Sequence, residues 1–168
     1  MGAVFKTVCE YVRACSGGFD SHTPPPSRFR NFDFGIRISH NMTQEEFKLR
    51  TKQFALRIIR LVESLPNTMT SNTIGRQLLR SGTSVGANYR AACRAKSLTD
   101  FINKLAIVEE EADESIYWIE LLVESKHINL DRVKSLTEEA NEIVSIIVAA
   151  IKTSKMKPNP KSQIRNPK

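Results

Sequence analysis

The chain has 168 residues and carries 25 lysines and arginines against 18 aspartates and glutamates, which gives a formal net charge of +7. That length suits one domain with a sizeable hydrophobic core, and no apolar run approaches the roughly 20 residues that a membrane span needs. The three cysteines lack metal-ligand spacing and support neither a disulfide framework nor a zinc site. We therefore expect a globular, cytoplasmic protein without a membrane partner. Its basic balance suggests nucleic acid. However, residues 42–152 carry 15 basic and 15 acidic side chains, so the excess comes from the two ends of the chain and does not support that inference.

The first 41 residues show no sustained helix or strand period and contain the run Pro24-Pro25-Pro26. A secretory signal peptide does not fit, because Lys6, Glu10 and Arg13 interrupt the apolar stretch that such a signal requires. We expect residues 1–41 to be a disordered or artefactual extension.

Helical periodicity begins directly after Met42. Thr43 and Glu46 have the spacing of a capping box, in which each side chain bonds the backbone of the other residue. The residues that then line one helix face are Phe47, Phe54, Ile58, Leu61 and Leu65. Pro66 ends this first helix.

The second predicted helix starts from a Ser71 or Thr70 cap. Its core face holds Ile74, Leu78, Ser81, Val85, Asn88 and Ala92. Gly75, Gly82 and Gly86 fall on one side of it, and each costs about 1 kcal/mol of helix propensity relative to alanine. Either another subunit or partner approaches closely there, or the glycines pack within the chain's own fold.

Two further helices follow. After a Ser97 cap, the third buries Phe101, Leu105, Val108, Ala112, Ser115, Ile119 and Leu122. The fourth starts near Asn129 and buries Val133, Leu136, Ala140, Ile143, Ile147 and Ala150. Pro158 prevents a regular helix beyond it, so residues 155–168 are expected to be a basic disordered tail.

Four long helices with short connections force antiparallel neighbours. The predicted fold is all-α, an antiparallel up-and-down four-helix bundle over residues 42–154. Ser81 and Asn88 are polar at core positions of the second helix. They either form a polar cluster that fixes register or bond neighbouring backbone or Ser115.

Charge is distributed unevenly within this bundle. Residues 70–96 contain no acid, and their basic side chains are Arg76, Arg80, Arg90, Arg94 and Lys96. The third helix carries eight acids against one base over residues 97–125. Its outer face should present Glu110, Asp113, Glu114, Tyr117, Glu120 and Glu124.

Three interpretations of these two faces remain open. The arginines of the second helix form an outward stripe, the arginine stripe: Arg76, Arg80, Arg90 and Arg94. This stripe could bind a nucleic-acid backbone, because guanidinium groups pair with phosphate. The stripe of one subunit could instead meet the acidic face of the next, with Tyr117 as an interface anchor. Alternatively, the two helices neutralise each other on a solvated surface of one bundle.

The sequence offers no catalytic residues, no metal ligands and no cofactor motif, so we expect no enzymatic activity. A di-metal carboxylate bundle needs two Glu-x-x-His pairs, and only Glu124 and His127 match that spacing. Ser84 stands in a Gly-x-Ser-x-Gly sequence, but a nucleophile elbow requires a strand-to-helix turn and this segment is predicted to be mid-helix.

An ordered string of residues resembles a known family. It comprises Ser81-Gly82-Thr83-Ser84-Val85-Gly86-Ala87-Asn88-Tyr89-Arg90-Ala91-Ala92, then Ser97 with Asp100-Phe101 and Lys104-Leu105, then Glu110-Glu111-Ala112-Asp113-Glu114 and Tyr117-Trp118-Ile119-Glu120-Leu121-Leu122. The string is similar to bacterial four-helix bundle proteins first noted as reading frames inside intervening sequences of 23S ribosomal RNA genes.

The resemblance covers about residues 44–154. It implies a cytoplasmic homo-oligomer, commonly a five-membered ring (a pentamer), with no established enzymatic activity. Similar proteins serve as accessory subunits to reverse transcriptases in diversity-generating retroelements, where a basic surface contacts nucleic acid. The resemblance therefore implies RNA or DNA and a reverse transcriptase-type protein as partners. A structural or protein-interaction adaptor, with its charged helices used only for assembly, is the alternative.

Overall fold

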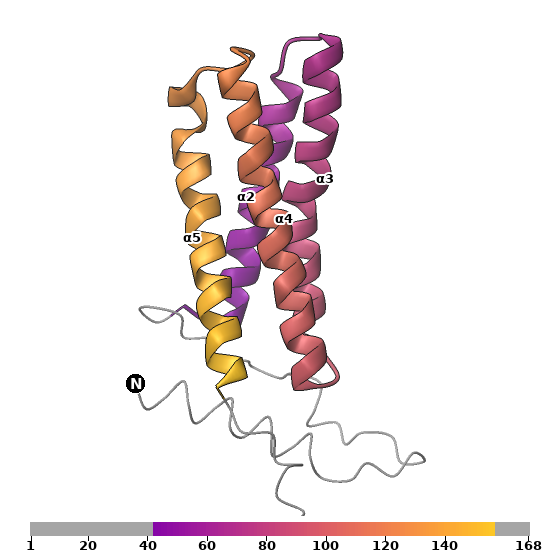
Figure 1. Ribbon diagram of the computed structural model, residues 1–168, viewed down its shortest axis with the longest axis vertical. Helices are drawn as coiled ribbons and strands as arrows, with labels where there is room; N and C mark the ends of the chain where they lie inside the picture. The colour runs from indigo at the N-terminus through magenta and orange to yellow at the C-terminus, as the bar shows by residue number, and fades with distance from the viewer. Residues whose placement is uncertain (1–41, 157–168) are drawn as a thin grey trace, which may run out of the picture.

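The computed structural model describes residues 42–156, and within them it contains four helices and no strand. The helices are α2 (Gln44–Glu63), α3 (Met69–Ala92), α4 (Leu98–Glu124) and α5 (Leu130–Lys155). Successive helices run in opposite directions and are joined by short loops at alternating ends (Figure 1). The predicted up-and-down four-helix bundle is thus confirmed. The predictions for residues 1–41, and for the tail after Met156, lie outside the described residues.

Side-chain caps define where the helices begin. Three of them, Thr43, Ser97 and Asn129, were expected. The predicted start of α3 was wrong: Thr68, not Thr70 or Ser71, is its N-cap, and its hydroxyl accepts from the Ser71 amide at 3.1 Å. Thr68 has an extended backbone, which turns its side chain toward the free amides of the first turn. The helix consequently gains its first turn from Met69 onward.

The core follows the predicted faces closely in α4 and α5, where every expected core residue is buried. In α3 the prediction needs a correction. Tyr89, not Asn88, is the fully buried side chain, and its ring meets Phe47 edge-on with the centroids 4.6 Å apart. Asn88 is half-buried and donates to the Ser84 carbonyl at 3.0 Å, within its own helix.

The other polar core position of α3 is paired inside the bundle. Ser115 of α4 donates a hydrogen bond to Ser81 Oγ at 3.0 Å, and both side chains are fully buried. The Ser115 hydroxyl also lies 2.7 Å from the Glu111 carbonyl. Ser81 therefore bonds Ser115, one of the two partners that sequence reasoning left open for it.

The glycines of α3 face α2 of the same bundle. A Cβ at Gly82 would lie 2.7 Å from Ile58 Cγ1, closer than real Cβ atoms approach. At Gly86 it would lie 3.5 Å from the Thr51 carbonyl oxygen, an ordinary contact. Gly75 is intermediate, with side-chain atoms of α2 and its following loop at 3.3 Å. The small residues thus bring α3 close to α2.

The seam between α2 and α5 is packed less closely than the other three seams between neighbouring helices. Part of it is bridged by charge: Arg50 of α2 donates to Glu139 at 2.6 Å and also to Glu142, both on α5. The Glu139 carboxylate is the main reason that the pKa of Arg50 lies above its ordinary value. No helix among the described residues is both long enough and apolar enough to cross a bilayer.

Candidate functional site

The predicted basic residues of α3 all lie on the surface, but they differ in their partners. Arg76 donates to the Asn72 carbonyl at 3.1 Å. Arg80 donates through one nitrogen to both carboxylate oxygens of Glu114, at 2.9 and 3.1 Å. Arg90 and Arg94 form no ion pair with any described residue. The carboxyl-terminal half of the stripe therefore retains its positive charge.

Two lysines of α2 join this half of the stripe. Lys48 and Lys52 lie beside Arg90 and Arg94 around an open hollow of about 380 Å³, whose remaining lining is Glu45 and Leu49. We call this hollow the α2–α3 groove. Its single carboxylate, Glu45, pairs with Lys48 at 2.7 Å, so four cations face one acid.

The close helix contact explains why these four side chains meet. At Gly86, α3 lies against the backbone of α2 at Thr51, the residue immediately before Lys52. Arg90 is one helical turn after Gly86, as Lys52 is one turn after Lys48. α2 thus supplies two cations one turn apart, while α3 supplies Arg90 and the turn directly after α3 supplies Arg94.

Lys96, the fifth basic residue predicted for this surface, is exposed but does not line the groove. It follows α3 in the loop, where its amide donates to Asp100 at 3.0 Å. The sequence analysis missed Lys48 and Lys52, because it compared only the charges of α3 and α4 and did not consider α2. Their spacing of four residues on the solvent side of α2 was the available signal.

A buried polar cluster lies beside the groove. Burial raises the pKa of both the Tyr89 hydroxyl and the Cys93 thiol, although Lys48 acts in the opposite direction on Cys93. Both groups are therefore held in their neutral forms. The cluster has the character of core packing, and Cys93 lacks the thiolate character of a nucleophile.

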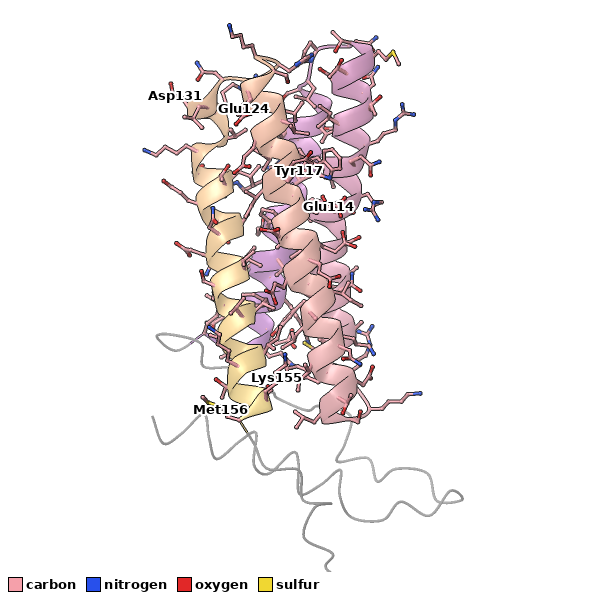
Figure 2. The ribbon with its side chains drawn as sticks, in the orientation of Figure 1. Glu114, Tyr117, Glu124, Asp131, Lys155 and Met156 are labelled. Atoms are coloured by element: carbon pink, nitrogen blue, oxygen red, sulfur yellow. The ribbon has the colours of Figure 1, made fainter. Side chains whose placement is uncertain are left out.

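The acidic residues of α4 also differ in whether they pair with a cation. Glu114 bonds Arg80 of α3 and accepts from Trp118 Nε1 at 3.0 Å, so it links two helices. Tyr117 is 52% exposed and lies edge-on to Trp118, with the ring centroids 5.0 Å apart. Figure 2 shows Glu114, Tyr117 and Glu124 in sequence along α4. The other predicted acids are exposed and form no ion pair with any described residue: Glu110, Asp113, Glu120 and Glu124.

The described part of the chain contains no group of three or more His, Cys, Asp or Glu residues placed to hold a metal ion. The Glu-x-x-His match at the end of α4, Glu124 and His127, belongs to no such group among the described residues. His127 lies with its Nδ1 atom 2.8 Å from the Ser125 hydroxyl, in the turn after the helix.

Comparison with known proteins identifies a family and a similar solved structure. The family model described as "23S rRNA-intervening sequence protein" matches residues 44–149. One similar crystal structure is that of a protein of unknown function from the S23 ribosomal protein family of Bacteroides thetaiotaomicron VPI-5482. The sequence of that protein is 39% identical to this chain. The match covers 65% of this chain and 97% of that one, with a TM-score of 0.61. No curated protein matches the chain.

Proposed function

The chain belongs to the family of 23S rRNA-intervening sequence proteins, and we propose that it is a non-enzymatic accessory protein that binds nucleic acid through the α2–α3 groove. The observation that carries this proposal is the charge of the groove lining, where four cations from two helices face one carboxylate. The proposed site contains only some of the basic residues of α3 that the sequence analysis selected. Arg90 and Arg94 belong to the binding site, whereas Arg80 is occupied by Glu114.

Phosphate is the ligand group that this groove fits best. Arginine can bind a phosphate with two parallel hydrogen bonds, and lysine adds a compact point charge. Each phosphate that the protein neutralises releases condensed counterions, so binding is favoured by entropy and weakens as salt rises. Lys48 and Lys52 are four residues apart, a rise of about 6 Å along α2, so the groove can contact adjacent phosphates of a strand.

The test is nucleic-acid binding by the full chain carrying Arg90→Glu and Arg94→Glu. Fluorescence anisotropy with labelled single-stranded RNA and duplex DNA at low salt should show a loss of affinity of at least about tenfold for the nucleic acid that binds. The matched control is Lys134→Glu with Lys152→Glu, which makes the same charge change at exposed positions of α5. An equal loss in the control, or no binding by the unaltered protein, would refute the proposal.

A second candidate function is homo-oligomer assembly through the acidic face of α4, with the protein acting as an adaptor. The observation that favours it is Tyr117, a 52% exposed aromatic side chain one helical turn from Asp113 and Glu120, which form no ion pair with any described residue. Tyrosine is a frequent interface anchor, and carboxylates around it would repel phosphate. Assembly into a ring, for which the pentamer is our expectation, would repeat any groove that the interface leaves free.

Light scattering separates the two functions. If α4 forms the interface, Tyr117→Ala with Glu120→Lys should lower the mass in solution, while Arg90→Glu with Arg94→Glu should leave it unchanged. A mass that falls only with the arginine variant would place the groove in the interface instead. An unaltered protein that is monomeric would refute assembly.

A further inference from the structure

A second basic hollow lies at the opposite end of α2, where that helix meets α5. It measures about 250 Å³ and is lined by Arg57, Arg60, Leu61, Ser64, Arg132 and Leu136. We call it the arginine pocket. Three of its six lining residues are arginines and none is a carboxylate.

The arginines of this pocket lack the acidic partners found elsewhere along the same seam. Arg50, nearer the start of α2, is bound by two carboxylates of α5. By contrast, Arg57, Arg60 and Arg132 form no ion pair with any residue between 42 and 156. Three like charges around one hollow repel one another, and an anion between them would relieve that repulsion.

Serine side chains hold two of these arginines in place. Arg57 donates to the Ser135 hydroxyl at 2.8 Å, and Arg132 donates to the Ser64 hydroxyl at 3.0 Å. Ser64 in turn donates to the Leu61 carbonyl at 2.8 Å, which fixes the direction of its lone pairs. A guanidinium group has five donors, so each arginine keeps donors available for a ligand.

We propose that the arginine pocket binds a phosphate monoester. A terminal phosphate carries a charge of about −1.5 to −2 and offers three oxygens, which matches three guanidinium groups better than the single charge of a phosphodiester. The volume supports a small group, because sites for drug-sized ligands usually span about 300–1,000 Å³. Leu61 and Leu136 supply an apolar wall for the carbon atoms next to the phosphate.

This site is independent of the α2–α3 groove. The groove uses the first half of α2 together with α3, whereas the pocket uses the second half of α2 together with the start of α5. Lys152 and Lys155, exposed near the end of α5, line neither hollow, so replacing them gives the experiment a matched control.

The test is a titration of the isotopically labelled full chain, followed by nuclear magnetic resonance, with inorganic phosphate and with ribose 5-phosphate. We expect saturable shifts of the Ser64 and Leu136 amide signals. Arg60→Gln with Arg132→Gln should weaken binding about tenfold or more, since charged hydrogen bonds are lost. Lys152→Gln with Lys155→Gln, which removes the same charge at exposed positions near the end of α5, should leave it unchanged. Shifts that do not saturate, or that persist in the pocket variant, would overturn the proposal.

A second arm identifies the source of the phosphate, using two oligonucleotides that differ only in a 5′-phosphate or a 5′-hydroxyl group. The amides of the pocket should respond more strongly to the phosphorylated one if the ligand is a nucleic-acid terminus. Equal affinity for ribose 5-phosphate and the phosphorylated oligonucleotide would support a small phosphate ester. An equal response to both oligonucleotides, with no response to inorganic phosphate, would contradict a monoester site.

Discussion

Alanine at Gly82 and alanine at Gly86 should have opposite effects on stability, although both glycines lie on the same face of α3. The two sites differ in the room they leave: an added Cβ would meet Ile58 Cγ1 and Cγ2 at 2.7 and 2.8 Å at Gly82, but nothing closer than 3.5 Å at Gly86. Ile58 is completely buried, so it has little room to move aside. Ile58 therefore leaves no room for a side chain at position 82, whereas position 86 can accept a methyl group.

The two variants share one favourable contribution, which makes the comparison quantitative. Replacing glycine by alanine inside a helix contributes about 0.8–1.0 kcal/mol at either site. Overpacking a well-filled core costs about 1–3 kcal/mol, and this cost applies to Gly82 alone. Gly86→Ala should thus stabilise the protein by up to about 1 kcal/mol, and Gly82→Ala should destabilise it by up to about 2 kcal/mol. The difference between them measures the overpacking cost directly.

Urea unfolding, followed by circular dichroism, gives both free energies of unfolding if the slope with denaturant stays constant. The Ile58→Ala background provides the control, because it removes the two atoms that clash. There most of the penalty of Gly82→Ala should disappear, because only the Cβ of residue 58, 3.1 Å from the added atom, still lies close. The result is a favourable coupling between the two sites. Equal stabilisation by both glycine replacements in the unaltered background would refute the close contact of α2 with α3.

The remaining predictions concern a buried hydrogen bond and a helix cap. Ser115→Ala should destabilise the bundle by about 1 kcal/mol, and adding Ser81→Ala should cost less than the sum of the single changes, since the two hydroxyls bond each other; additive losses in urea unfolding would contradict this. Hydrogen bonds from Lys104 and from the Lys96 amide hold the pKa of Asp100 below its ordinary value. Stability from this carboxylate is therefore present above its unfolded pKa and lost as pH falls through the folded one. Asp100→Asn should flatten the acid side of a plot of unfolding free energy against pH, and an unchanged plot would contradict the prediction.

Local patterns in the sequence predicted most of the helices and their buried faces. Spacings of three and four place Leu105, Val108 and Ile119 on one side of α4 without any knowledge of its neighbours. Capping also depends on a few adjacent residues, which is why the start at Thr43 could be recognised. The start of α3 was harder, because Thr68, Thr70 and Ser71 are all good caps and backbone geometry selects among them.

Relations between helices could not be predicted in the same way. The excess of arginine on α3 and of acid on α4 was visible in the sequence. The sequence did not show that Arg80 pairs with Glu114, or that Arg90 forms no ion pair within residues 42–156. These partners are decided by how the helices pack, and by long side chains whose rotamers depend on their surroundings. For the same reason, sequence reasoning did not bring Lys48 of α2 to the groove.

Burial at the boundary of a helix face was also decided by packing. Tyr89 and Asn88 are consecutive, and helical spacing alone allows either to face the core. The tyrosine ring is buried because it meets Phe47 of α2, and its apolar area favours the interior more than an amide does. Asn88 satisfies its amide within its own helix instead.

The salt dependence of nucleic-acid binding tests the function of the α2–α3 groove most directly. For single strands, the logarithm of the binding constant falls with the logarithm of salt concentration by about 0.7 for each phosphate neutralised. Arg90→Gln with Arg94→Gln should therefore reduce the steepness by about 1.4, while Lys134→Gln with Lys152→Gln should leave it unaltered. A slope that is the same in the unaltered protein and the arginine variant would contradict binding through the groove.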